Sequence, residues 1–149
     1  LGIKKTVVNT SFFGRWQIIK SKPLVIFDVA HNIDAIKKIL KQLKKEDKDI
    51  RFVFGTLDKP GQIKILDILP TDYFYYFCEI NIPRSMRIEK IKRKAKSNKL
   101  KFKSYSLPKE AYQSALNESK KNDIIFVTGS TFVISEILSF NYEYNNWGL

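Results

Sequence analysis

Polar side chains that can take part in ligand binding follow two apolar runs of the chain. Asp28 comes directly after Leu24–Phe27, and His31 and Asn32 follow it closely. A carboxylate at the end of a strand can accept hydrogen bonds from a ribose diol, and the single histidine can titrate near neutrality or stack on a base. Ser130 follows the second run at the expected start of a helix, where free backbone N–H groups favour a phosphate or a carboxylate. These residue types predict an anion or nucleotide site.

Two basic residues extend this candidate site. Arg15 follows Gly14 at the start of an apolar run, where a guanidinium can bind phosphate through two hydrogen bonds. Lys59 follows another apolar run and can pair with an anion. Each polar residue also has an ordinary structural interpretation: Asp28 can brace its own loop, and Ser130 can simply cap the following helix. Spacing alone leaves both interpretations open.

The motifs of several other site classes are missing from the sequence. The chain has one cysteine, Cys78, and one histidine, so we predict neither a disulfide framework nor a metal site within it. It contains no Walker-type glycine loop and no Ser-His-Asp pattern. Low cysteine usage predicts a cytoplasmic protein.

Short apolar runs alternate with stretches of helical periodicity, which determines the expected fold. Strands are expected at Trp16–Ile19, Leu24–Phe27, Ile50–Phe54, Tyr73–Cys78, Phe102–Tyr105 and Ile124–Val127. Helices are expected after Asn32, at Ile63–Leu69, around Ile88–Ala95 and Ala111–Leu116, and at Thr131–Phe140. The last helix is apolar nearly all round and is expected to be buried, and residues 141–149 are expected to form a loose tail.

This alternation predicts one α/β domain over residues 1–149, a mostly parallel sheet with helices on both faces. The first two strands are too close for a crossover helix, so we expect them to pair antiparallel and place one antiparallel strand at an edge. Ligands of such sheets bind beyond the carboxyl ends of the strands. That edge is where Asp28, His31, Lys59 and Ser130 are expected.

The chain is strongly basic, with a formal net charge of +12. Its densest basic cluster is Lys90–Lys103, which could attract nucleic acid. Few aromatic residues are interleaved with these lysines, and a base-stacking platform is therefore not evident. No apolar run is long enough to span a bilayer, and we expect no membrane partner.

Several segments together resemble one known family. They are Gly14-Arg15-Trp16, Asp28-Val29-Ala30-His31-Asn32, Gly55-Thr56-Leu57-Asp58-Lys59, Pro83-Arg84-Ser85 and Val127-Thr128-Gly129-Ser130. In this order and spacing, the chain resembles the C-terminal domain of folylpolyglutamate synthase and dihydrofolate synthase, within the Mur ligase superfamily. Three positions depart from the family's usual pattern: Phe13 replaces proline, Val29 replaces glycine and Thr131 replaces leucine.

The resemblance implies a Rossmann-like three-layer sandwich of the Mur ligase C-terminal type. It also implies an ATP-dependent amide ligase that joins L-glutamate to a folate or dihydropteroate through an acyl phosphate. Arg15 would contact the nucleotide phosphates and Asp28 the ribose, while His31, Asn32, Lys59 and Ser130 would line the cleft near adenine or glutamate. The phosphate loop and the Mg²⁺ ligands would belong to an N-terminal domain, so the chain alone is expected to be inactive.

Two alternatives stay open on the sequence. The first is a cell-wall ligase of the Mur type, which adds amino acids to a nucleotide-linked precursor. A basic nucleic-acid-binding α/β module would instead use Lys90–Lys103, with an affinity that falls steeply as salt rises.

Overall fold

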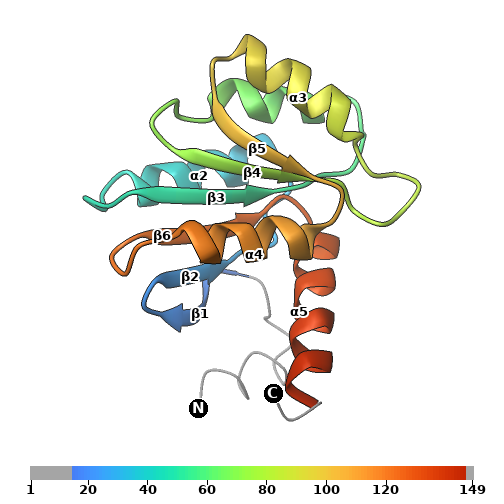
Figure 1. Cartoon of the computed structure of the whole chain (residues 1–149). Coiled ribbons are helices and arrows are strands. Elements are labelled where there is room, and N and C mark those ends of the chain that lie inside the picture. Colours follow the sequence, from blue (N-terminus) through green and yellow to red (C-terminus); the bar gives the residue numbers. More distant parts are fainter. Residues whose placement is uncertain (1–14, 147–149) are drawn as a thin grey trace.

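A twisted six-stranded sheet forms the centre of the molecule in the computed structural model, which describes residues 15–146, with side chains described up to Ser139. Figure 1 shows helices on both of its faces. The elements in chain order are β1 (Gln17–Ser21), β2 (Leu24–Phe27), α2 (Ile33–Leu43), β3 (Ile50–Phe54), the 3-10 helix η1 (Gln62–Ile68), β4 (Phe74–Cys78), α3 (Ile88–Ser97), β5 (Lys101–Tyr105), α4 (Pro108–Glu118), β6 (Ile124–Thr128) and α5 (Thr131–Asn146).

The strands lie in the order β1-β2-β6-β3-β4-β5. Strand β1 pairs antiparallel with β2, and each of the other neighbouring pairs is parallel. The predicted mostly parallel sheet with one antiparallel edge strand is therefore confirmed. Strand β6 lies between β2 and β3, and all five of its residues are buried, as its continuous apolar run predicts.

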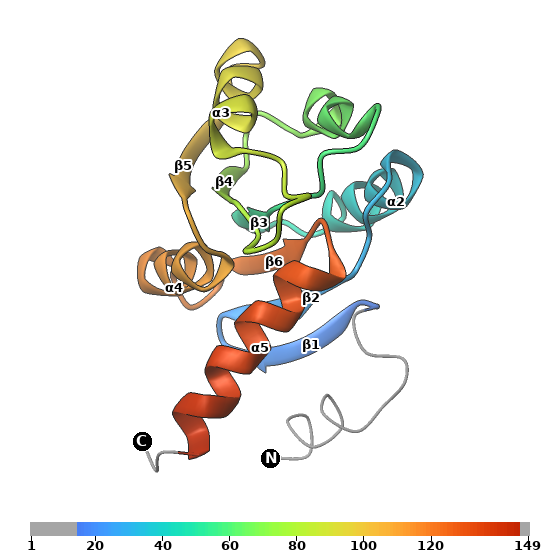
Figure 2. The same cartoon turned by 90° about the vertical axis from the view of Figure 1, so that its right-hand side faces the viewer.

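The two faces of the sheet carry separate apolar cores. On one face, Ile36 of α2, Ile65 of η1 and Ile91 of α3 pack against Phe52 and Phe126. On the other face, the buried residues of α4 and α5 pack against Val53 and Val127. Figures 1 and 2 show these layers on either side of the sheet. The expected three-layer sandwich is confirmed.

Asn32 starts helix α2 as predicted. Its side-chain oxygen accepts a hydrogen bond from the backbone N–H of Ala35 at 2.9 Å, and Asp34 lies in the first turn, where a carboxylate favours the positive end of the helix dipole. The apolar face predicted from the sequence is buried at Ile36, Ile39 and Leu43.

Two helices differ from their sequence-based expectation. Residues 62–68 form a 3-10 helix that follows Gly61, a glycine with a φ of 79°. Helix α5 continues to Asn146 instead of ending near Phe140, because no Gly or Pro interrupts the chain before Gly148. The expectation that this helix is buried holds for one side of it, where Val133, Ile134 and Ile137 are buried, and is wrong for the other. Phe132 is 40% exposed, and the hydroxyls of the exposed Ser135 and Ser139 bond to carbonyl groups one turn earlier.

Candidate functional site

A cleft of about 310 Å³ lies at the carboxyl ends of the parallel strands. It is lined by the loops that follow β2, β3, β4 and β6, and by the first turn of α5. Figure 2 views the molecule from this edge of the sheet. Four of the predicted site residues, His31, Asn32, Lys59 and Ser130, line this single cleft.

The strand order explains why the cleft is found here. Strands β2 and β3 are followed by α2 and η1, which cover one face, whereas β6 between them is followed by α5, which covers the other face. Adjacent parallel strands whose connections leave to opposite faces open a crevice at their carboxyl ends, where ligands of α/β sheets bind.

Direct backbone contacts hold the loops after β2, β3 and β6 together. The carbonyl oxygen of Ala30 accepts hydrogen bonds from the Gly129 N–H at 3.0 Å and from the Thr128 hydroxyl at 3.2 Å. Gly129 has a φ of 113°, and a Cβ atom there would lie 2.1 Å from the carbonyl oxygen of Gly55. Only glycine meets both conditions, so the floor of the cleft depends on Gly129.

Ser130 caps α5, as its structural interpretation predicts. Its Oγ accepts a hydrogen bond from the Phe132 N–H at 3.1 Å, and the residue is 4% exposed. The cleft is lined by Gly129, Ser130, Thr131 and Phe132, so the positive end of the α5 dipole opens toward it. A helix N-terminus of this kind favours a carboxylate or phosphate.

The side chains that line the cleft give it positive charge. Lys59 and Arg84 both contribute, and the lining contains no Asp or Glu. Two backbone contacts hold the loop that carries Arg84 against the loop that carries Lys59. The Arg84 carbonyl oxygen accepts a hydrogen bond from the Asp58 N–H at 2.8 Å, and Leu57 forms an antiparallel β-bridge with Ser85. In the sequence, Arg84 stands out only as part of the Pro83-Arg84-Ser85 motif, and no role is predicted for it. Its position after the fourth strand was the available signal.

Asp28 and Arg15 lie beside the cleft and are not among its lining residues. The Asp28 carboxylate accepts from the Trp16 N–H at 2.9 Å and from the Ala30 N–H at 2.8 Å. It therefore braces its loop, as its structural interpretation predicts, and holds the residue after Arg15 against the end of β2. Arg15 is exposed. Gly14, which was predicted together with Arg15, lies outside the described residues.

His31 is exposed at the mouth of the cleft. Its Nδ1 lies 3.3 Å from the carbonyl oxygen of Val29. Within residues 15–146, no cluster of three or more His, Cys, Asp or Glu side chains could hold a metal ion. In the same part of the chain, no helix is long and apolar enough to cross a membrane.

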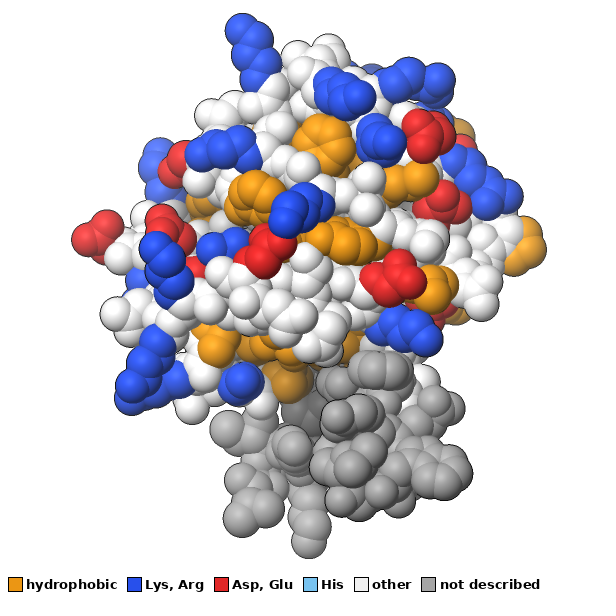
Figure 3. Space-filling model, in the orientation of Figure 1, with side chains coloured by type: hydrophobic (Ala, Val, Ile, Leu, Met, Phe, Trp, Pro, Cys, Tyr) orange, Lys and Arg blue, Asp and Glu red, His pale blue; other side chains and the backbone are white. Residues whose placement is uncertain are grey.

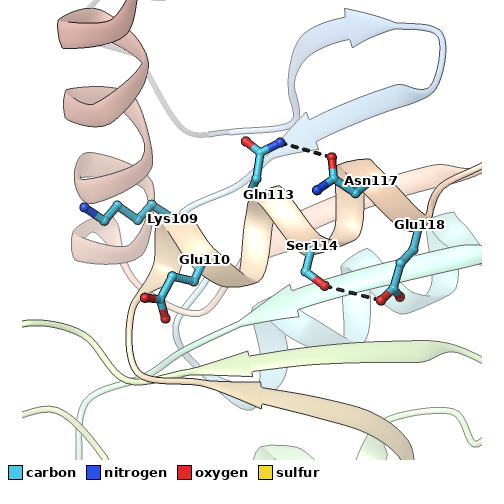
Figure 4. Close-up of a pocket in the computed structure, with 6 residues that line it drawn as sticks. All are labelled: Lys109, Glu110, Gln113, Ser114, Asn117 and Glu118. Atoms are coloured by element: carbon cyan, nitrogen blue, oxygen red, sulfur yellow. Dashed lines mark hydrogen bonds between the residues drawn. The ribbon is translucent and has the colours of Figure 1, made fainter.

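A second hollow, of about 500 Å³, lies on α4 (Figure 4). All of its lining residues come from this one helix, and they bond one another: Gln113 donates to Asn117, and Ser114 donates to Glu118. It shares no lining residue with the cleft described above. We assign it no ligand.

Ion pairs neutralise much of the Lys90–Lys103 cluster. Lys90 pairs with Asp58, Lys94 with Asp67, Lys92 with Glu89 and Lys103 with Glu118. Figure 3 shows basic and acidic side chains interspersed over the face that it displays. This pairing favours a solvated surface over a continuous polyanion-binding stripe.

The order of the strands defines a doubly wound α/β domain. Its positively charged cleft lies where neighbouring strands send their helices to opposite faces of the sheet, and this cleft suits an anionic ligand. The chain belongs to the family of Mur ligase glutamate ligase domains, whose family model matches residues 14–131. The family expected from the sequence motifs is confirmed.

Relatives of known function cover this chain almost completely. The chain is 29% identical over 140 residues to a dihydrofolate synthase/folylpolyglutamate synthase of Buchnera aphidicola subsp. Schizaphis graminum. This match covers 92% of this chain and 33% of that protein. It is 27% identical over 141 residues to the Escherichia coli enzyme of the same name, covering 91% of this chain and 32% of that protein. The chain thus spans about a third of the length of these curated relatives.

Solved structures share the fold. The bifunctional folylpolyglutamate synthase/dihydrofolate synthase of Yersinia pestis, complexed with AMPPNP and a Mn ion, matches with a TM-score of 0.78 and 23% sequence identity. The match covers 90% of this chain and 32% of that chain. Another structure of a bifunctional enzyme of this name has Mn, AMPPNP and L-glutamate bound and a TM-score of 0.79. The predicted Mur ligase C-terminal type of fold is confirmed.

Proposed function

We propose that this chain is the C-terminal domain of an ATP-dependent ligase that joins L-glutamate to a folate or a dihydropteroate. Its family and the names of its relatives support this assignment. One observation in the chain itself carries it: a cleft lined by Lys59 and Arg84, without any carboxylate, at the N-terminus of α5. An amino acid with two carboxylates fits such a cleft.

The proposed reaction begins when a folate carboxylate takes the terminal phosphoryl group of ATP and becomes an acyl phosphate. The amino group of glutamate then attacks the acyl carbon, inorganic phosphate leaves and an amide bond forms. The attacking amine must be neutral. The two cations at the cleft favour its neutral form, because a nearby positive charge lowers the pKa of an ammonium group.

The residues of this chain bind and orient the reactants in this proposal. Arg15 contacts the nucleotide phosphates, where its guanidinium stabilises charge that spreads during phosphoryl transfer. Asp28 holds the ribose. Lys59, Ser130 and His31 line the glutamate cleft, with Asn32 beside the nucleotide. Closure over the nucleotide would exclude water from the acyl phosphate.

A divalent ion would supply charge neutralisation at the transferred phosphate, and we assign Mg²⁺ to this role. The described residues of this chain offer no carboxylate cluster for it. We propose that its ligands and the phosphate loop belong to an N-terminal domain, the partner that completes the active site.

The assignment is tested by assaying ATP-dependent glutamate addition with this chain alone and with the complete protein that carries it. We expect turnover of dihydropteroate or a reduced folate by the complete protein and none by the chain alone. Turnover by the isolated chain would contradict the proposed division of the site. Addition of an amino acid to a nucleotide-linked cell-wall precursor, with no reaction on folates, would establish the cell-wall alternative.

A further inference from the structure

Gln62 is a cleft residue with no role in the site described so far. It is the first residue of η1 and lines the cleft together with His31 and Lys59. Its side-chain Nε2 donates one hydrogen bond to the backbone carbonyl oxygen of His31 and another, 2.8 Å long, to Oγ1 of Thr56. These two acceptors belong to different loops, which follow β2 and β3 respectively.

The chemistry of the acceptors determines the orientation of the Gln62 amide. A backbone carbonyl can only accept, so the NH₂ end of the amide must face His31 and its oxygen must face away. Both Nε2 hydrogens then have partners. Thr56 is 1% exposed, and it therefore provides a rigid anchor on the β3 side.

The contact joins parts of the cleft that the sheet itself keeps apart. Strand β6 lies between β2 and β3, so the loops after β2 and β3 are not held together by direct strand pairing. Gln62 bridges these two loops through its side chain. Gly129, at the end of β6, bonds Ala30 of the first loop and closely approaches Gly55 of the second.

We propose that Gln62 is a positioning residue of the cleft, whose amide clamps the loop that carries His31 to the loop that carries Lys59. The clamp holds these two side chains at the spacing that the incoming amino acid requires. This inference rests on the proposed function for its substrate, although the clamp itself is a property of the chain.

The kinetic test is the variant Gln62→Glu in the complete ligase, with Gln113→Glu as the matched control. The change in Gln62 keeps the size of the side chain and removes both donors. Gln113 lies on the exposed surface of α4, where its amide donates to Asn117 on the same helix (Figure 4). We expect the KM for glutamate to rise about tenfold or more in Gln62→Glu, because the loops that carry His31 and Lys59 lose the two hydrogen bonds that hold them together. We expect the KM to stay at the wild-type value in the control.

A second measurement is independent of the reaction. In the 149-residue chain, we expect the side-chain amide hydrogens of Gln62 to exchange with solvent more slowly than those of Gln113, as followed by NMR. Equal exchange rates would overturn the clamp whatever the enzyme's substrate.

The remaining outcomes separate the two proposals. A wild-type ligase that adds no glutamate contradicts the proposed function. The hydrogen-exchange rates of the Gln62 amide then test the clamp by themselves. An active wild type whose Gln62→Glu variant only melts earlier, with an unchanged KM for glutamate, shows a merely structural role and overturns the inference. If Gln62→Glu does not fold, Gln62→Met, which lacks the donors and the charge, is compared with Gln113→Met in the same way.

Discussion

At the scale of residues, the Asp28 carboxylate has hydrogen-bonding capacity beyond the contacts that brace its loop. Each of its carboxylate oxygens accepts one backbone N–H, from Trp16 or Ala30. A carboxylate has about four acceptor positions in all, so these bonds leave capacity for the two hydroxyls of a ribose. The bracing interpretation and the nucleotide interpretation of Asp28 are therefore compatible.

Substitution separates these two roles. In the complete ligase, we expect Arg15→Ala and Asp28→Ala each to weaken ATP use by roughly 10–1,000-fold, the scale of a lost charged contact at about 1.4 kcal/mol per tenfold. Asp28→Ala should also lower the free energy of unfolding by about 1.5–3 kcal/mol, because two backbone donors lose a charged acceptor. Arg15→Ala should leave stability unchanged, since Arg15 is exposed. Steady-state kinetics and urea unfolding measure the two effects, and unchanged kinetics in both variants would reject the site assignment.

Gly129 is the residue on which the cleft floor depends most directly. We expect Gly129→Ala to destabilise the fold by about 1–3 kcal/mol from backbone strain alone, with a further cost as the new Cβ displaces the Gly55 carbonyl that would lie 2.1 Å away. Gly61→Ala is the matched control, since it has a φ of 79° and no neighbouring atom within 4 Å of the added Cβ. Thermal melting compares the two. Equal losses would show that close packing at Gly129 is unimportant.

At the scale of elements, a polar network joins β3, β4, β5 and the residue before β6 to α4. Arg51 of β3 pairs with Asp123 just before β6 at 2.9 Å and donates to the Tyr76 hydroxyl of β4 at 2.6 Å. Tyr76 in turn donates to Glu118 at the end of α4, at 2.7 Å. Glu118 also pairs with Lys103, and this partner holds the pKa of Glu118 below its usual value. The network thus ties the end of α4 to the sheet.

Asp123 is the most buried charge of this network, at 4% exposure. We expect Asp123→Ala to cost about 3–5 kcal/mol of folding free energy, because two charge-assisted hydrogen bonds are lost. The Arg51 guanidinium loses its nearer carboxylate and keeps Glu118 at 3.8 Å, and the Lys120 N–H loses its acceptor. Glu110→Ala on the exposed surface of α4 is the control. Chemical denaturation measures both, and a loss below about 1 kcal/mol at Asp123 would mean that solvent replaces the carboxylate.

At the scale of the whole molecule, buried tyrosines predict how stability depends on alkaline pH. Burial raises the pKa of Tyr112 to about 12, and burial also raises the pKa of Tyr75 and of Tyr76. An unfolded tyrosine ionises near pH 10, so the unfolded state loses its protons first. The stabilisation is fully present below about pH 10 and is lost as the pH rises toward 12.

We therefore expect the free energy of unfolding to fall by about 1.4 kcal/mol per pH unit for each such tyrosine above pH 10. Tyr112→Phe should reduce the slope of unfolding free energy against pH by the contribution of one tyrosine, about 1.4 kcal/mol per pH unit. Phe cannot ionise, and it keeps the edge-on contact with Phe27. Urea unfolding between pH 9 and pH 12 measures the slope. An unchanged slope in Tyr112→Phe would show that Tyr112 does not contribute to the loss of stability at alkaline pH.

Much of the architecture could be predicted from local patterns. The alternation of apolar runs and helical periodicity predicted each strand to within two residues at either end, and Asn32 marked the start of α2. The end of α5 could not be predicted, because no Gly or Pro marks it within the described chain. Its exposed face was missed because Phe132 is apolar yet lies at the rim of the cleft.

The sequence by itself determined the α/β class, the antiparallel edge and the family, because these depend on residue types at short spacing and on ordered motifs. Only the tertiary structure decided which residues share the cleft. Insertion of β6 between β2 and β3 brings Ala30, Gly55 and Gly129 into contact, and this long-range order cannot be read from local periodicity. The same packing adds Arg84 and Gln62 to the cleft and makes Asp28 a brace beside it.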